Sequence, residues 1–250
     1  MTGVFDGMAA LVTGAGSGIG AATAELIAEQ GGRVAAFDIA DTTGSTQVLS
    51  IRGDVRDQAS IDDGVERTIR EFGRLDVLVN CAGIGSVGDV EAASDDEWSN
   101  VFDVNLFGVV RMVRVCLPHI KASPVGTVVN VSSILATIGV PNRACYAASK
   151  GALYSLTFAM AADLATQGVR VNCVMPGTIG TPWVERLLGG SADPEGERKR
   201  LTARQPLGRL GNPGEVARAI AFLASPYSGF VTGTALAIDG GMSGLRIPSE

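Results

Sequence analysis

The sequence predicts a doubly wound α/β fold in a single domain, with a parallel sheet of about seven strands and helices on both faces. Short apolar runs rich in β-branched residues alternate with longer helical runs, and no linker interrupts them over the first 180 residues. The apolar runs have no polar face, which is typical of strands buried on both sides in a parallel sheet. A chain of 250 residues is near the largest size that one hydrophobic core holds, so residues 1–250 are expected to form one domain.

The first half of the chain contains four expected strands and two expected helices. The β-rich apolar runs at 8–13, 33–38, 48–52 and 76–80 predict strands, and the runs at 18–30 and 57–72 predict helices. Only 16 residues separate Asp38 from Asp54. A helix between the second and third strands therefore has room for a turn or two at most.

The second half continues the alternation up to about residue 180. Two helical stretches are expected within 94–121, a strand at 126–131, a long helix at 146–167 and a strand at 169–175. Residues 181–210 break the pattern with a concentration of glycine, proline and charged residues. That composition favours a mobile lid over a site, and the alternative is a plain solvated excursion.

Composition and charge exclude several classes of protein. The net charge of −6 and the pI of 4.9 disfavour binding to nucleic acid or to an anionic membrane. No apolar run reaches the ~18 residues of a membrane helix, and the N-terminus lacks the basic region of a signal peptide. The four cysteines have spacings that fit no metal site, so they are expected to be reduced thiols in a cytoplasmic chain, and no metal is predicted.

The single histidine limits the chemistry further. His119 follows Pro118 in an apolar helical pattern, where a surface or helix-end imidazole is the simplest interpretation. A Ser-His-Asp triad or a zinc site of several histidines would have to be built around this one ring. Acid–base work is therefore expected from tyrosine, lysine or carboxylates.

A glycine-rich turn joins the first expected strand to the first expected helix. Unpaired backbone amides at a helix N-terminus attract phosphate, and glycines let the phosphate approach closely. Asp38 ends the second strand at the distance expected in a dinucleotide-binding unit. The residues of the turn predicted to contact a dinucleotide are Gly14, Ser17, Gly18, Ile19 and Gly20.

Asp38 favours NAD over NADP as the cofactor. A carboxylate here can accept both ribose hydroxyls and repels a 2′-phosphate, and Ile39 offers no cation to hold one. The alternative is that Asp38 only caps the strand end. Asp54 and Val55, after the third strand, are placed to accept from the adenine amino group and to pack on its ring. The residues that close the fourth strand complete this part of the cofactor site, namely Asn80, Ala82 and Gly83.

Tyr146 and Lys150 stand four residues apart at the start of a helix, so their side chains project from one face. Such a pair alone is more often structural. A tyrosine with its ordinary pKa of ~10 is a poor base at neutral pH, but a nearby ammonium and an oxidised nicotinamide ring favour the phenolate. Ser133 follows an apolar strand thirteen residues before Tyr146, and its hydroxyl is expected at the same sheet edge.

Taken together, these residues resemble the short-chain dehydrogenase/reductase family. The matching pieces span residues 8 to 241, nearly the whole chain. They are the glycine-rich turn, Asn80-Cys-Ala-Gly83, Asn105, Ser133, Tyr146 with Lys150, Pro176-Gly177 and the closing Ile238-Asp239-Gly240-Gly241. The resemblance implies an NAD-binding doubly wound sheet of the Rossmann type.

The resemblance also implies a role for each matched residue. Tyr146 is the general acid and base, Lys150 lowers its pKa and binds the nicotinamide ribose, Ser133 holds the substrate oxygen, and Asn105 anchors a proton-relay water. The family turn that binds the carboxamide is similar to Pro176, Gly177, Ile179 and Thr181. Two departures are Cys81, where the family usually has asparagine, and Leu135-Ala136, where Ala-Gly is common. They bear on the substrate pocket and leave the catalytic set intact.

Within the family, the chain is most similar to dehydrogenases of small hydroxy acids, of the cytosolic 3-hydroxybutyrate and 2-keto-3-deoxy-fuconate types. This similarity rests on the short connection after Asp38 and on the stretches 140–143, 176–179 and 203–209. The expected activity is NAD-dependent interconversion of a secondary alcohol and a ketone on a small hydroxy acid or acid sugar. Arg143 and Arg204 are predicted to bind the substrate carboxylate. The alternative is that both arginines pair with the chain's own acids, Glu185 or Glu197 among them.

Other functions and the assembly state stay open at this stage. The alternatives are an NADPH-dependent 3-oxoacyl reductase, a polyol or aldose dehydrogenase, and a non-catalytic dinucleotide-sensing regulator. The helical stretches 105–121 and 146–167 carry more apolar surface than one sheet can cover. Because relatives pair these helices across two-fold axes, a symmetric homotetramer is expected, with a dimer as the alternative.

Overall fold

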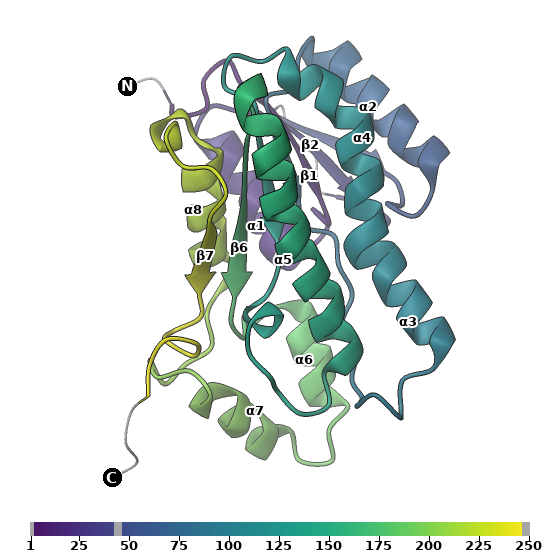
Figure 1. Cartoon of the computed structure of the whole chain (residues 1–250), viewed down its shortest axis with the longest axis vertical. Coiled ribbons are helices and arrows are strands. Elements are labelled where there is room, and N and C mark those ends of the chain that lie inside the picture. Colours follow the sequence, from purple (N-terminus) through teal and green to yellow (C-terminus); the bar gives the residue numbers. More distant parts are fainter. Residues whose placement is uncertain (1–2, 43–46, 247–250) are drawn as a thin grey trace.

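The computed structural model describes residues 3–42 and 47–246. Within these ranges the chain forms a seven-stranded, all-parallel sheet in the order β3-β2-β1-β4-β5-β6-β7, with helices on both faces (Figure 1). The predicted doubly wound α/β fold is confirmed. The strands are β1 (Ala9–Thr13), β2 (Arg33–Asp38), β3 (Val48–Arg52), β4 (Val77–Asn80), β5 (Thr127–Val131), β6 (Arg170–Pro176) and β7 (Ala235–Ile238).

Five of the described α-helices match the predicted helical runs, and the three that follow residue 181 were not predicted. The helices are α1 (Gly18–Glu29), α2 (Gln58–Phe72), α3 (Asp95–Phe102), α4 (Gly108–Lys121), α5 (Ala144–Leu164), α6 (Pro182–Gly189), α7 (Pro194–Ala203) and α8 (Pro213–Ala224). The predicted ends differ from these by a few residues, as helix ends generally do. The connection after Asp38 has no helix in its described part, and residues 43–46 lie outside the described residues.

The core has two layers because successive side chains of each strand point to opposite faces of the sheet. Leu11, Leu78 and Val128 lie on the face covered by α2, α4 and α5. Their neighbours in the strands, including Val12 and Val129, lie on the face covered by α1 and α8. All of these side chains are fully buried, which explains why the strands have no polar face.

Two irregular regions lie near the carboxyl ends of the strands. Between α3 and α4 the helix widens into a π turn at Asp103–Phe107, which contains Asn105. Residues 181–210 form α6 and α7, which lie beyond the arrowheads of β6 and β7 in Figure 1. Thr181 caps α6 by accepting a hydrogen bond from the Val184 backbone, and Pro182 follows at its first position. None of the described helices is both long and apolar enough to span a membrane.

Candidate active site

A pocket of about 540 Å³ lies at the carboxyl ends of the strands. Ligands of open α/β sheets bind at this edge. Every residue predicted to contact cofactor, substrate or reacting atoms lines the pocket, except Asn80 and Asn105. Asn80 is buried beneath it and donates from Nδ2 to Asn130 Oδ1 at 2.9 Å. The side-chain oxygen of Asn80, Oδ1, has no hydrogen-bond partner among the described residues.

The glycine-rich turn has the shape that a phosphate needs. Gly14 has a φ of 66°, and a side chain on it would lie 2.7 Å from the backbone nitrogen of Ala82. At Gly20 an added methyl group would overlap the Gly14 carbonyl. The side chain of Ser17 forms no cap on α1, so the first amides of this helix face the pocket without a side-chain acceptor. These amides and the helix dipole suit a pyrophosphate.

Asp38 is fixed at the rim of the pocket by two backbone amides. Its Oδ2 accepts from Gly16 at 2.8 Å, and its Oδ1 accepts from Ala40 at 2.8 Å. These bonds are those of a strand-end cap, and each carboxylate oxygen keeps a lone pair for a further donor. Ile39 is 63% exposed beside it and brings no positive charge to this rim.

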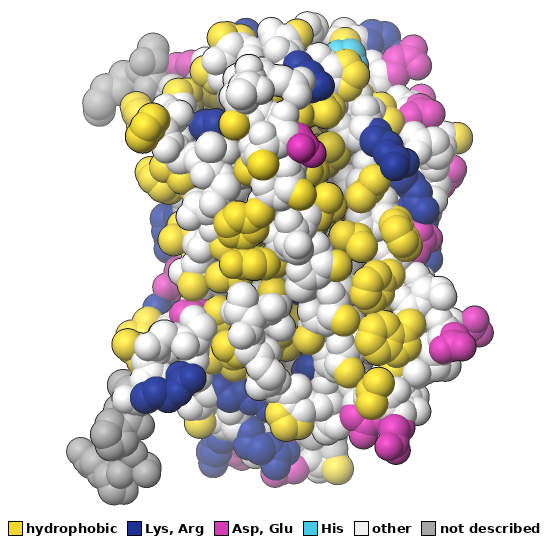
Figure 2. All heavy atoms as spheres, in the orientation of Figure 1, with side chains coloured by type: hydrophobic (Ala, Val, Ile, Leu, Met, Phe, Trp, Pro, Cys, Tyr) yellow, Lys and Arg dark blue, Asp and Glu magenta, His cyan; other side chains and the backbone are white. Residues whose placement is uncertain are grey.

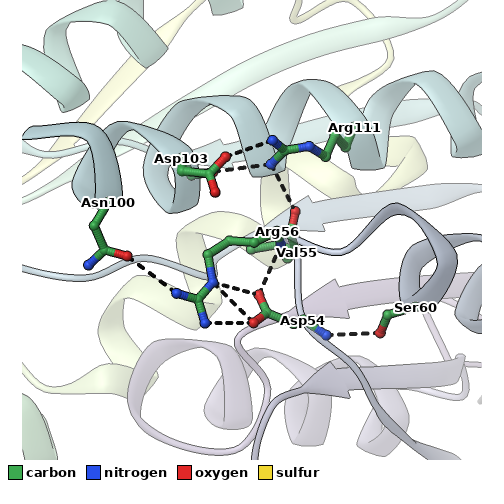
Figure 3. Close-up of polar contacts among 7 residues, drawn as sticks. All are labelled: Asp54, Val55, Arg56, Ser60, Asn100, Asp103 and Arg111. Atoms are coloured by element: carbon green, nitrogen blue, oxygen red, sulfur yellow. Dashed lines mark hydrogen bonds and ion pairs between the residues drawn. The ribbon is translucent and has the colours of Figure 1, made fainter. Parts of the chain in front are cut away.

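Asp54 is engaged by an arginine that the sequence did not point to (Figure 3). Both carboxylate oxygens of Asp54 accept from Arg56, the shortest bond being 2.7 Å from Nη2. Arg56 also donates to Asn100 Oδ1 on α3 at 3.3 Å. The Arg56 guanidinium lowers the pKa of the Asp54 carboxyl below its ordinary value. Asp54, the predicted acceptor for the adenine amino group, is therefore an ionised carboxylate that is already paired with Arg56.

A second arginine ties the same loop to the helix that contains the π turn (Figure 3). Arg111 of α4 donates to Asp103 at 2.6 Å and to the Val55 carbonyl at 3.4 Å. A methyl group on Gly108, at the start of α4, would lie 2.8 Å from Val55 Cγ2. The wall predicted to hold adenine thus packs directly on the helix beside Asn105.

Ser133, Tyr146 and Lys150 meet at the end of β5. Lys150 Nζ donates to the Val131 carbonyl at 2.8 Å and lies 5.9 Å from the centroid of the Tyr146 ring. The Ser132 hydroxyl donates to the Lys150 carbonyl at 2.9 Å and so fixes α5 against the strand. Ser133 is 6% exposed, and its hydroxyl lies close enough to the Tyr146 phenol to affect its pKa. The three side chains therefore share one wall of the pocket.

Asn105 lies behind this wall. Its Oδ1 accepts from the Ile84 backbone at 2.8 Å, and its Nδ2 donates to the Ile84 carbonyl and to Ser149 Oγ, each at 3.0 Å. Ser149 in turn donates to the Tyr146 carbonyl at 2.8 Å. The Asn105 side chain thus connects the π turn to the helix of Tyr146.

Arg143 and Arg204, the predicted carboxylate-binding residues, both line the pocket. The alternative that they pair with Glu185 or Glu197 is wrong, because Glu185 pairs with Arg198 at 2.6 Å and Glu197 pairs with Arg200 at 2.7 Å. Arg143 and Arg204 form no ion pair with any residue in the described ranges.

The family is decided by a comparison with known protein families. Residues 14–243 match the family model described as enoyl-(acyl carrier protein) reductase. The chain belongs to the short-chain dehydrogenase/reductase family. It is accordingly an oxidoreductase of the type that acts on alcohol and ketone substrates with a nicotinamide dinucleotide, and a non-catalytic regulator is not supported.

Three relatives illustrate the range of the family around this chain. It is 41% identical to a cis-4-hydroxycyclohexanecarboxylate dehydrogenase from Sinomonas cyclohexanicum, over 96% of this chain and 98% of that one. It is 39% identical to a 3-oxoacyl-[acyl-carrier-protein] reductase from Thermotoga maritima, over 95% and 98%. A 3-ketoacyl-(acyl-carrier-protein) reductase from Brucella melitensis, solved with NADH, superposes with a TM-score of 0.87 at 34% identity, over 95% and 99%.

Burial is the largest influence on the pKa values of Tyr146 and Lys150. It lowers the pKa of Lys150 to about 8 and raises the pKa of the Tyr146 phenol above its ordinary value. Ser133 and Arg143 act on Tyr146 in the opposite direction but do not outweigh burial. The lowering of the Tyr146 pKa by Lys150 together with an oxidised nicotinamide stays a prediction for the loaded enzyme. Burial also raises the pKa of Cys81 to about 12, so this residue is a neutral thiol at physiological pH.

The sequence did not single out three residues that the pocket contains. Arg56 is the partner of Asp54, and Trp183 and Arg186 project from α6. Trp183 and Arg186 belong to the charged segment 181–210, whose composition was the available signal. The sequence had no signal for the contact between Arg56 and Asn100, which are 44 residues apart.

Proposed function

We propose that the chain is an NAD-dependent dehydrogenase that interconverts a secondary alcohol and a ketone on a small hydroxy acid or acid sugar. The observation that carries the proposal is Arg143, which lines the pocket of Tyr146 and has no ion-pair partner among the described residues. Burial lowers the pKa of the Arg143 guanidinium, and the nearby Arg204 lowers it further. Glu197 acts on Arg143 from a distance in the opposite direction, but neither arginine has an ion-pair partner among the described residues, which favours a substrate that brings its own anion.

The residues of the chain divide the work of the oxidation. Ser133 Oγ donates to the substrate oxygen, and Tyr146 as phenolate takes the hydroxyl proton at Oη. When bound, the oxidised nicotinamide accepts the hydride from the carbinol carbon, and its positive charge favours the phenolate. Lys150, held by the Val131 carbonyl, places an ammonium beside the Tyr146 ring. In the reverse direction Tyr146 returns the proton to the alkoxide oxygen.

Asp38 supports NAD as the cofactor. Its carboxylate is held at the pocket rim by Gly16 and Ala40, where a negative charge would repel a 2′-phosphate, and Ile39 adds no positive charge. A 3-oxoacyl reductase that uses NADPH is the second candidate, because the Thermotoga maritima relative is a 3-oxoacyl-[acyl-carrier-protein] reductase. The two candidates differ in cofactor preference and in the charge of the substrate.

A matched substrate screen tests the proposal. Acids such as cis-4-hydroxycyclohexanecarboxylate and 3-hydroxybutyrate are compared with the analogues in which a hydroxymethyl group replaces the carboxylate, and reduction of NAD is followed at 340 nm. We expect the acids to be better substrates, and Arg143→Ala and Arg204→Ala each to raise KM for the acid with KM for NAD little changed. Neutral analogues oxidised as efficiently as every acid would contradict the carboxylate role and favour a polyol dehydrogenase.

The proposal includes a symmetric homotetramer in the cytoplasm. Hydrophobic side chains gather on the face formed by α4 and α5 (Figure 2), where Ala148, Ala159 and Ala162 are exposed and Phe107 is 50% exposed. Small and apolar residues on adjacent helices favour close packing against a second copy. All four cysteines are free thiols, as suits a reducing compartment. Light scattering at micromolar concentration should give the mass of four chains, and a monomer would contradict this.

A further inference from the structure

The segment 181–210 has a small core of its own. Val184 and Leu188 of α6 pack with Leu201 of α7 and with Leu210, apart from the two clusters that pack on the sheet. The segment can therefore keep its shape while its position over the pocket is set by a few contacts to the rest of the chain. The Thr178 backbone donates to Gln205 Oε1 at 3.0 Å, and the Leu207 backbone donates to the Gly240 carbonyl at 3.1 Å. Trp183 makes a third contact beside the pocket.

Trp183 lies directly on the backbone of Gly85. A methyl group on Gly85 would overlap Cζ2, Cε2 and Cη2 of the indole, so only glycine leaves room for the ring. The indole of Trp183 is 39% exposed although it makes this contact. A bulky aromatic residue on a separate helix thus rests on a glycine of the main body.

The same indole also contacts Arg143. The guanidinium carbon of Arg143 lies 5.8 Å from the centroid of the Trp183 ring, within the range of a cation–π interaction. Arg143 Nη1 donates to the Ser86 carbonyl at 3.0 Å, next in sequence to Gly85. Arg143 lies three residues before Tyr146, and its backbone forms an isolated β-bridge with Gly88. An uncharged ring on one side and a carbonyl on another leave the remaining N–H donors of Arg143 for a ligand.

We propose that Trp183 is a positioning residue. Its contact with Gly85, which we call the seat, fixes the segment 181–210 on the rest of the chain. Its contact with Arg143 then holds the guanidinium in place for the anion of the substrate. The seat is a property of the fold, whereas its effect on catalysis rests on the proposed function. Seating of the segment and placement of the anion-binding group are then one event, because a single indole contacts both the body and the arginine.

The seat is tested without any substrate by tryptophan fluorescence. The chain has two tryptophans, and Trp98 stacks on Phe102 of α3 outside the pocket lining, so Trp98→Phe leaves Trp183 as the only indole emitter. In this background Gly85→Ala, which keeps an allowed backbone, should displace the ring and raise its acrylamide quenching constant about twofold. Gly139→Ala is the matched control, since nothing lies within 4 Å of its added methyl group. Equal quenching in all three proteins would overturn the seat.

The link to Arg143 has its own readouts. In the same background Arg143→Met should also raise the quenching constant, because the cation that covers the indole is lost. With 3-hydroxybutyrate as substrate, Gly85→Ala and Trp183→Ala should raise KM about fivefold or more, with KM for NAD changed less than about twofold. Trp183→Phe, which keeps an aromatic face, should recover most of the loss. Equal changes in both KM values would overturn the positioning role, and failure to oxidise any acid would instead refute the proposed function and leave the quenching result standing.

Discussion

The proton of Tyr146 should make the affinity for NAD depend on pH. In the chain alone, burial holds the pKa of the phenol above its ordinary value of about 10. Base catalysis near neutral pH needs the phenolate in the loaded enzyme, so the pKa must fall by more than about three units, which requires a differential stabilisation of at least about 4 kcal/mol. By linkage, NAD then binds with the release of a proton.

Lys150 sets the range of pH in which this release occurs. Burial lowers its pKa to about 8 in the chain alone, whereas a phenolate beside it favours the ammonium. Below pH 8 the free enzyme already carries the ammonium, so binding releases the Tyr146 proton. Above pH 8 binding also takes up a proton at Lys150, and the two cancel. For a phenol pKa of about 7 in the complex and a Lys150 pKa of about 8 in the free chain, the affinity for NAD should rise about threefold from pH 7 to 8 and level off above about pH 9.

Isothermal titration calorimetry measures both quantities. Titrations of NAD in two buffers with different ionisation enthalpies give the number of protons released, and the dissociation constants give the slope with pH. Tyr146→Phe is the control, because it keeps the ring and removes the proton, and its affinity for NAD should not change between pH 7 and 8. A wild-type affinity that is constant over this interval, with no proton released, would refute the reasoning.

Three further variants test separate parts of the site. Tyr146→Phe should lower kcat by orders of magnitude while NAD still binds, and near-normal turnover would exclude Tyr146 as the base. Asp38→Ala should narrow the preference for NAD mainly by improving kcat/KM with NADP, and equal values for both cofactors in the unaltered enzyme would contradict the role of Asp38. Arg56→Ala should lower the free energy of unfolding in urea by less than about 1 kcal/mol, because its ion pair with Asp54 is partly exposed. A much larger loss would mean that this ion pair stabilises the whole wall predicted to hold adenine.

The sequence predicted the sheet and the proximity of Ser133, Tyr146 and Lys150 because both depend on strong local constraints. Each strand is buried on both faces, so its residues are apolar without interruption, and the turn at Gly14 has a positive φ and no room for a side chain. Tyr146 and Lys150 share a helix face by their spacing alone. These features leave a signature within a few residues of sequence.

The contacts of charged side chains could not be predicted in the same way. The chain has 20 lysines and arginines and 26 acids, so an arginine such as Arg56 has many partners of equal chemistry, and only the fold brings Asn100 beside it. Trp183 was missed because its partner, Gly85, leaves no side-chain pattern. The rise of the Tyr146 pKa in the chain alone could not be predicted, because neighbouring charges can be read from a motif, whereas the degree of burial cannot.

The charge inside the pocket differs in sign from that of the whole chain, and this bears on the choice of substrate. The chain carries −6, so its average surface repels anions. Among the described residues, the charged groups that line the pocket are Asp38, Asp54, Arg56, Arg143, Lys150, Arg186 and Arg204. Asp54 neutralises Arg56, which leaves one acid against four cations when Lys150 is protonated. A dinucleotide brings negative charge at its phosphates, but Arg143 lies beside Tyr146 at the reacting end of the site. A cation at that end of an otherwise acidic protein supports the proposed function, in which Tyr146 deprotonates a substrate that carries a negative charge.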